Sequence, residues 1–108
     1  MSTRKPARPS EVRVGPYLYE IEYRDEVSES EPDLFGLTLN RDHKIIVSTR
    51  QTDLALRDTV LHECLHAVFA SSGLFREVEN EERIVSAAAT WLLMLLRDNH
   101  DLAKFLTA

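Results

Sequence analysis

The sequence predicts an α+β protein with an antiparallel sheet first and helices second. In the first half of the 108 residues, hydrophobic and polar side chains alternate, which is typical of strands. After Ser48 the hydrophobic spacing changes to three or four residues, which is typical of helices. Strands followed by helices favour α+β over alternating βα units. The length favours one domain with one core.

Two hairpins are expected in the first half. The stretch EVRVGPYLYEIEYRDE alternates on both sides of Gly15-Pro16, which predicts strand, turn and strand. The polar residues 27–33 indicate a loop. A second hairpin is predicted over residues 35–48, with turn residues NRDHK at 40–44.

A long helix is expected next. Ser48 and Gln51 have the spacing of a capping box before Leu54. Hydrophobic residues then recur at helical intervals, and Gly73 can take the left-handed conformation that ends a helix.

A second helix and a short third helix complete the pattern. Asn80 can cap the second helix, which is expected to run to about Arg97. Asp98-Asn99 is predicted to break it, and hydrophobic residues within 102–106 indicate the third helix.

Composition limits the classes of function. The formal net charge of −5 argues against a primary role on nucleic acid, since phosphate binding favours a basic face. Residues 1–10, MSTRKPARPS, are basic and contain two prolines, so a flexible basic arm is expected before a single domain over 11–108. The longest apolar run, residues 87–96, is too short for a membrane helix. No secretory signal is visible, and the one cysteine allows no internal disulfide, so a soluble cytoplasmic protein is expected.

The stretch TVLHECLHAVFA carries the chemistry. His62 and His66 are four residues apart on the expected helix, so both imidazoles lie on one face and can reach one zinc ion. Glu63 lies one step around the helix, where it can take a proton from a metal-bound water. The alternative is a hydrogen-bonded polar cluster without metal. Cys64 is interpreted as a small buried residue and not as a ligand.

A catalytic zinc site usually needs a third protein ligand. Glu81 and Glu82 open the second helix, which is otherwise mostly apolar. Helical periodicity puts Glu81 on the apolar face and Glu82 at its edge, which favours Glu81. Acidic residues also favour a helix N-terminus without any metal.

The two helical segments, TVLHECLHAVF at 59–69 and EERIVSAAATWLLMLLRDN at 81–99, resemble a gluzincin-type metallopeptidase. More closely, the chain is similar to very small proteins of phages and prophages related to the ImmA/IrrE-type minimal metallopeptidases. The resemblance extends over VRVGPYLYEIEY and LFGLTLNRDHKIIVS, and so over most of the chain after residue 10.

This resemblance implies a zincin-like fold, with Zn²⁺ held by His62, His66 and a glutamate of the second helix, and with Glu63 as general base. Alignment of the second helix favours Glu82 as the third ligand, with Glu81 as its rival. Ser86 stands where related enzymes often have Asp or Asn. No oxyanion-stabilising residue can be assigned, and the candidates by residue type are Tyr17, Tyr19, Tyr23, His43 and His100.

The expected function is a zinc-dependent endopeptidase acting on a protein or peptide, with neither nucleic acid nor membrane as partner. An extended peptide could add to an exposed sheet edge, predicted at Ile45–Ser48. One alternative is a non-catalytic zinc-binding accessory protein of a phage or prophage. Another is a metal-free α+β module in which HECLH arises by coincidence.

Overall fold

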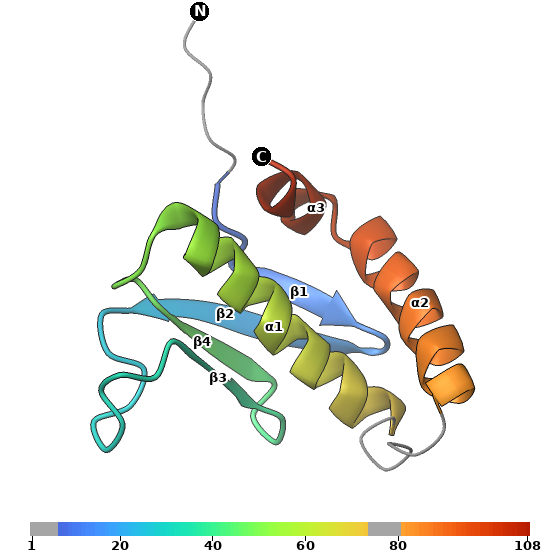
Figure 1. Cartoon of the computed structure of the whole chain (residues 1–108), viewed down its shortest axis with the longest axis horizontal. Helices are drawn as coiled ribbons and strands as arrows, with labels where there is room; N and C mark the ends of the chain where they lie inside the picture. The colour runs from blue at the N-terminus through green and yellow to red at the C-terminus, as the bar shows by residue number, and fades with distance from the viewer. Residues whose placement is uncertain (1–6, 74–80) are drawn as a thin grey trace, which may run out of the picture.

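The computed structural model describes residues 7–73 and 81–108, without the side chains of residues 81–83, 85 and 86. Its elements confirm the α+β class (Figure 1). In chain order they are β1 (Glu11–Val14), β2 (Tyr17–Arg24), β3 (Gly36–Leu39), β4 (Lys44–Ser48), α1 (Asp53–Ser72), α2 (Glu81–Asp98) and α3 (His100–Leu106).

The four strands form one mixed sheet in the order β1-β2-β4-β3. Both predicted hairpins are confirmed, because β1 pairs with β2 and β3 pairs with β4 in antiparallel fashion. The prediction of a wholly antiparallel sheet is wrong, since β2 and β4 pair in parallel. Turn residues determine the pairing inside a hairpin, whereas the pairing between the two hairpins depends on long-range contacts.

The predicted sheet edge is also wrong. β4 lies inside the sheet, and β3 is the edge strand on that side. Residues 45–48 of β4 are all buried, which fits a strand covered on both faces. Their unbroken apolar run, Ile45-Ile46-Val47, is the sequence signal of such a strand.

Helix α1 crosses one face of the sheet, and α2 and α3 lie beside it (Figure 1). One core joins the sheet to all three helices. Its buried members are Val12, Val14, Tyr19, Ile21, Ile45, Val47, Leu56, Val60, Cys64, Ala67, Val68, Leu95, Leu102 and Phe105. Trp91 of α2 packs against this core and lies close to the first hairpin at Gly15. A Cβ on Gly15 would lie 2.9 Å from the Trp91 ring, so a glycine is needed there.

The end of α1 was predicted correctly and its start was not. Thr52 is the N-cap, and its hydroxyl accepts a hydrogen bond from the Ala55 amide at 3.2 Å. The expected capping box fails because Ser48 belongs to β4 and Gln51 donates to the Ser48 carbonyl at 2.8 Å. Gly73 ends the helix with φ of 77°, as expected.

The two remaining helices agree with the prediction wherever they are described. α2 ends at Asp98, one residue beyond the expected end, and α3 follows after Asn99. The predicted cap at Asn80 lies outside the described residues. None of the described helices combines the length and apolar character that crossing a membrane requires.

Candidate metal centre

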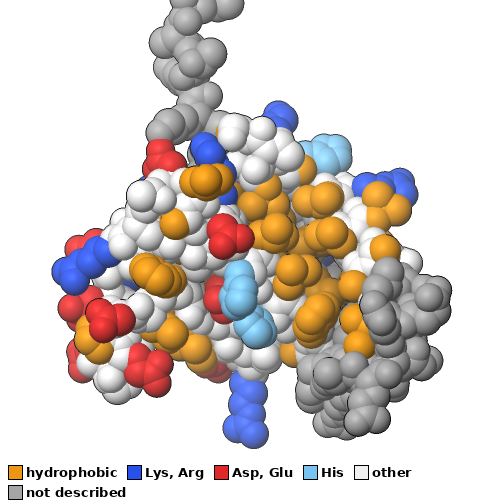
Figure 2. All heavy atoms as spheres, in the orientation of Figure 1, with side chains coloured by type: hydrophobic (Ala, Val, Ile, Leu, Met, Phe, Trp, Pro, Cys, Tyr) orange, Lys and Arg blue, Asp and Glu red, His pale blue; other side chains and the backbone are white. Residues whose placement is uncertain are grey.

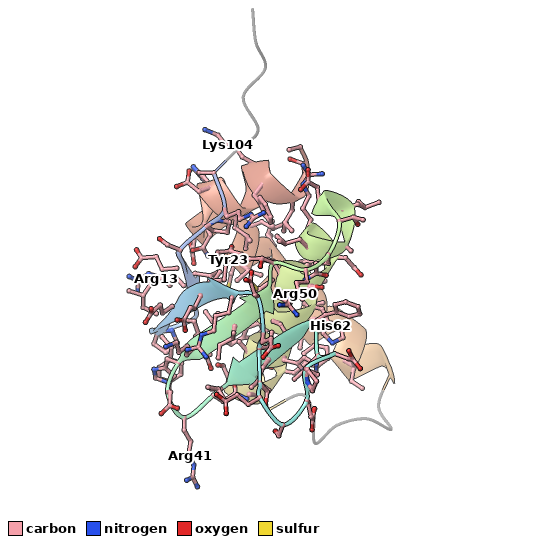
Figure 3. All side chains as sticks on the ribbon, turned by 90° about the vertical axis from the view of Figure 1, so that its left-hand side faces the viewer. Arg13, Tyr23, Arg41, Arg50, His62 and Lys104 are labelled. Carbon is pink, nitrogen blue, oxygen red and sulfur yellow. The ribbon has the colours of Figure 1, made fainter. Side chains whose placement is uncertain are left out.

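His62 and His66 meet on the exposed face of α1. The two Nε2 atoms are 3.1 Å apart, and the ring centroids are 4.7 Å apart at an interplanar angle of 74°. Figure 2 shows histidine side chains in contact near the middle of this face, and Figure 3 places His62 across the molecule from Arg13 of β1. The pair converges because residues four apart lie one above the other on a helix.

The spacing of the two nitrogens fits a shared metal ion. Imidazole nitrogens bind zinc at about 2.0–2.1 Å, and tetrahedral angles then separate two of them by about 3.3 Å. The Nε2 atoms of His62 and His66 lie within a few tenths of an ångström of that separation. The same distance also allows a hydrogen bond between the rings, provided that one ring carries its proton on Nε2.

Glu63 points from the same helix turn towards edge strand β3. Glu63 is 6% exposed, and among the described residues it and Ser48 are the buried polar ones. The Thr38 hydroxyl lies 2.8 Å from Glu63 Oε1 and 3.0 Å from the Glu63 carbonyl oxygen, and it can donate to either. A buried carboxylate needs such a donor, so Thr38 fixes the position of Glu63.

Gly36 lets β3 approach α1 this closely. A Cβ at this position would lie 2.7 Å from Thr59 Cγ2 and 2.9 Å from both Cγ and Oε2 of Glu63. Neither Gly36 nor Thr38 was identified from the sequence. The available signal was a glycine inside a predicted strand, which often marks a close approach of another segment.

The side chains of the predicted third ligands, Glu81 and Glu82, lie outside the described residues, as does that of Ser86. Only the backbone of Glu81 and Glu82 is described, in the first turn of α2. Within the described part of the chain, no group of three or more His, Cys, Asp and Glu side chains is arranged to hold a metal ion. The described site is therefore a histidine pair with an adjacent buried carboxylate.

Cys64 is buried in the core, as the sequence predicted. Burial, followed by the nearby Glu63 charge, raises the pKa of its thiol to about 12. Its side chain is fully buried, whereas His62 and His66 are both exposed.

The candidate oxyanion residues divide into separate groups. The His43 ring lies beside the rings of Tyr17 and Tyr19, with centroids 4.8 and 5.1 Å away. The Tyr23 hydroxyl donates to the Pro9 carbonyl at 2.8 Å, and burial raises its pKa above the ordinary value. His100 lies at the start of α3.

Comparisons of this chain with protein-family models, with curated proteins and with solved structures found no match.

Proposed function

We propose that this protein is a zinc-dependent endopeptidase, with His62 and His66 as metal ligands and Glu63 as general base. The observation that supports this most strongly is the 3.1 Å separation of the two Nε2 atoms on successive turns of α1. Residues four apart on a helix can bring their ring nitrogens together, and at this separation one metal ion can bind both nitrogens. A glutamate directly between them in the sequence adds the group that hydrolysis needs.

The chain's own residues have distinct tasks in this proposal. A zinc ion held by the histidines would supply a polarised carbonyl and a water of lowered pKa. Glu63 would accept a proton from the attacking water and would later deliver it to the leaving amine. Because Thr38 engages Oε1, Oε2 is the oxygen assigned to the proton.

The third ligand is proposed to come from the first turn of α2. The sequence resemblance favours Glu82, and helical periodicity favours Glu81. Exchanging each for glutamine separates the two, because only loss of the true ligand lowers zinc affinity.

Edge strand β3 is proposed to hold the substrate. It lies at the border of the sheet and its Gly36 and Thr38 contact α1 at Thr59 and Glu63. A free strand edge can pair with an extended peptide through backbone hydrogen bonds. Such pairing would bring a peptide bond of the substrate beside the histidine pair. The proposed substrate is a protein or peptide in the cytoplasm of a bacterial or phage-infected cell.

The test combines metal content with cleavage. Protein purified without a histidine tag is expected to contain one zinc per chain by elemental analysis. Glu63→Gln should keep the zinc and lose cleavage of an unfolded protein, whereas His62→Ala should lose both. A wild type without stoichiometric zinc, or a Glu63→Gln protein that cleaves normally, contradicts the proposal.

A second candidate is a non-catalytic zinc protein. It is favoured by the exposure of both histidines, which leaves their side of the site open to a partner. Stoichiometric zinc, together with no cleavage over a broad peptide library, would select this candidate.

A further inference from the structure

A cavity of about 230 Å³ opens beside the C-terminal part of α1. Figure 1 shows that both hairpin turns lie towards this end of α1. The described residues that line the cavity are Tyr17, Tyr19, Asn40, His43, Ala70 and Ser71. We propose that this cavity is a specificity subsite for an aromatic side chain of the peptide substrate, within about two residues of the bond that is cleaved. The proposal rests on the proposed peptidase function.

The wall of the cavity is held in a fixed arrangement. The His43 ring is tilted by 39° against Tyr17 and by 43° against Tyr19. The Tyr19 hydroxyl donates to Asn40 Oδ1 at 3.0 Å, which joins β2 to the β3–β4 turn. His43 has φ of 49°, a left-handed conformation uncommon for a residue other than glycine. The Glu20 amide donates to the His43 carbonyl at 3.0 Å and helps to hold this conformation.

The cavity continues the line of contacts between β3 and α1. Along β3, Gly36 touches Thr59 and Glu63, and Thr38 bonds to Glu63. Just beyond β3, Asn40 lines the cavity together with Ala70. β3 and α1 therefore run side by side in the same direction, and His66 lies between the level of Glu63 and the level of the cavity.

The distance from the histidine pair matches a peptide substrate. Ala70 follows His66 by four residues, which is a rise of about 6 Å and a rotation of about 40° on an α-helix. An extended peptide advances about 3.3 Å per residue. A peptide beside β3 whose carbonyl reaches the histidine pair thus carries its neighbouring side chains to the level of the cavity.

The chemistry of the wall selects an aromatic occupant. Three rings line the cavity, and none of its described lining residues is Asp, Glu, Lys or Arg. Aromatic rings pair favourably at centroid distances of about 4.5–7 Å. The volume of about 230 Å³ lies below the roughly 300–1,000 Å³ of typical small-molecule pockets, so it suits one side chain better than a whole ligand.

The test is to fill the cavity with a larger side chain from α1. Ala70→Leu adds bulk at a half-buried helical position, and Ala89→Leu makes the same change at an exposed position of α2 as its control. Cleavage of a peptide library by wild type should show kcat/KM about tenfold higher for Phe, Tyr or Trp than for Ala at one position flanking the cleaved bond. Ala70→Leu should lose most of this preference, whereas Ala89→Leu should keep it. A preference unchanged in Ala70→Leu, or no aromatic preference at any flanking position, overturns the subsite and leaves the peptidase standing.

A binding measurement separates the two proposals. An acetylated and amidated Ala-Phe-Ala-Ala peptide is added to Glu63→Gln protein, and amide shifts are followed by NMR. Shift changes at Asn40 and Ala70 that vanish with an alanine peptide and with Ala70→Leu support the subsite, even if wild type cleaves nothing. Binding without a contribution from the phenyl ring, or no binding at all, overturns it.

Discussion

At the residue scale, the hydroxyl of Thr38 connects the edge strand to the proposed base. It reaches both the side chain and the backbone of Glu63. Thr38→Val keeps the shape and removes the donor, so we expect kcat to fall about tenfold with unchanged zinc content. Thr38→Ser should restore the rate because it restores the hydroxyl. Wild-type kcat in Thr38→Val would show that this hydrogen bond does not position Glu63.

Gly36 gives a second prediction at this scale. Gly36→Ala forces a Cβ within 3 Å of Thr59 and Glu63, and we expect a loss of about 1–3 kcal/mol in the free energy of unfolding, together with lower activity. Gly73→Ala is the comparison, since a Cβ built there meets no side chain of the described residues within 4 Å, and its positive φ of 77° makes alanine costly. Urea unfolding measures both variants. The interpretation fails if Gly36→Ala is as stable and as active as wild type.

At the element scale, Asn99, the residue between α2 and α3, is hydrogen-bonded to edge strand β1. Its side chain accepts from the Arg13 amide at 2.8 Å and donates to the carbonyls of Arg13 at 3.0 Å and Leu95 at 2.8 Å. Asn99→Ala removes these bonds, so we expect a loss of about 1–3 kcal/mol in stability and faster hydrogen exchange at the Arg13 amide. Unchanged exchange at that amide would contradict this role.

Local sequence signals predicted the helices and strands. The features that the sequence did not predict depend on contacts between residues far apart in the chain. The turn at Gly15-Pro16 and the helix end at Gly73 depend on neighbouring residues, and both were predicted correctly. The parallel pairing of β2 with β4 brings together segments from different hairpins, which period-two alternation cannot specify. The spacing of His62 and His66 predicted their convergence, because a helix turn alone produces it. Gly36, Thr38 and the cavity beside Ala70 needed the packing of β3 against α1.

At the scale of the whole molecule, the ionisation of Tyr23 is expected to make the free energy of unfolding depend on pH in the alkaline range. Burial is the main cause that raises its pKa above the ordinary value of 10.0. The folded chain thus keeps this proton to higher pH than the unfolded chain, and the stabilisation is present below about pH 10 and lost as pH rises further. Urea midpoints should fall above pH 10, and less steeply in Tyr23→Phe, which has no phenolic proton. Equal slopes in the two proteins would contradict the linkage.

We propose that two imidazoles of α1 and a carboxylate of α2 bind one metal ion. X-ray absorption at the zinc edge of the metal-loaded protein tests this most directly. We predict a four-coordinate zinc with two imidazole nitrogens, at least one oxygen and no sulfur. A spectrum with sulfur at about 2.3 Å, or a zinc without imidazole scattering, would contradict the assignment of His62 and His66.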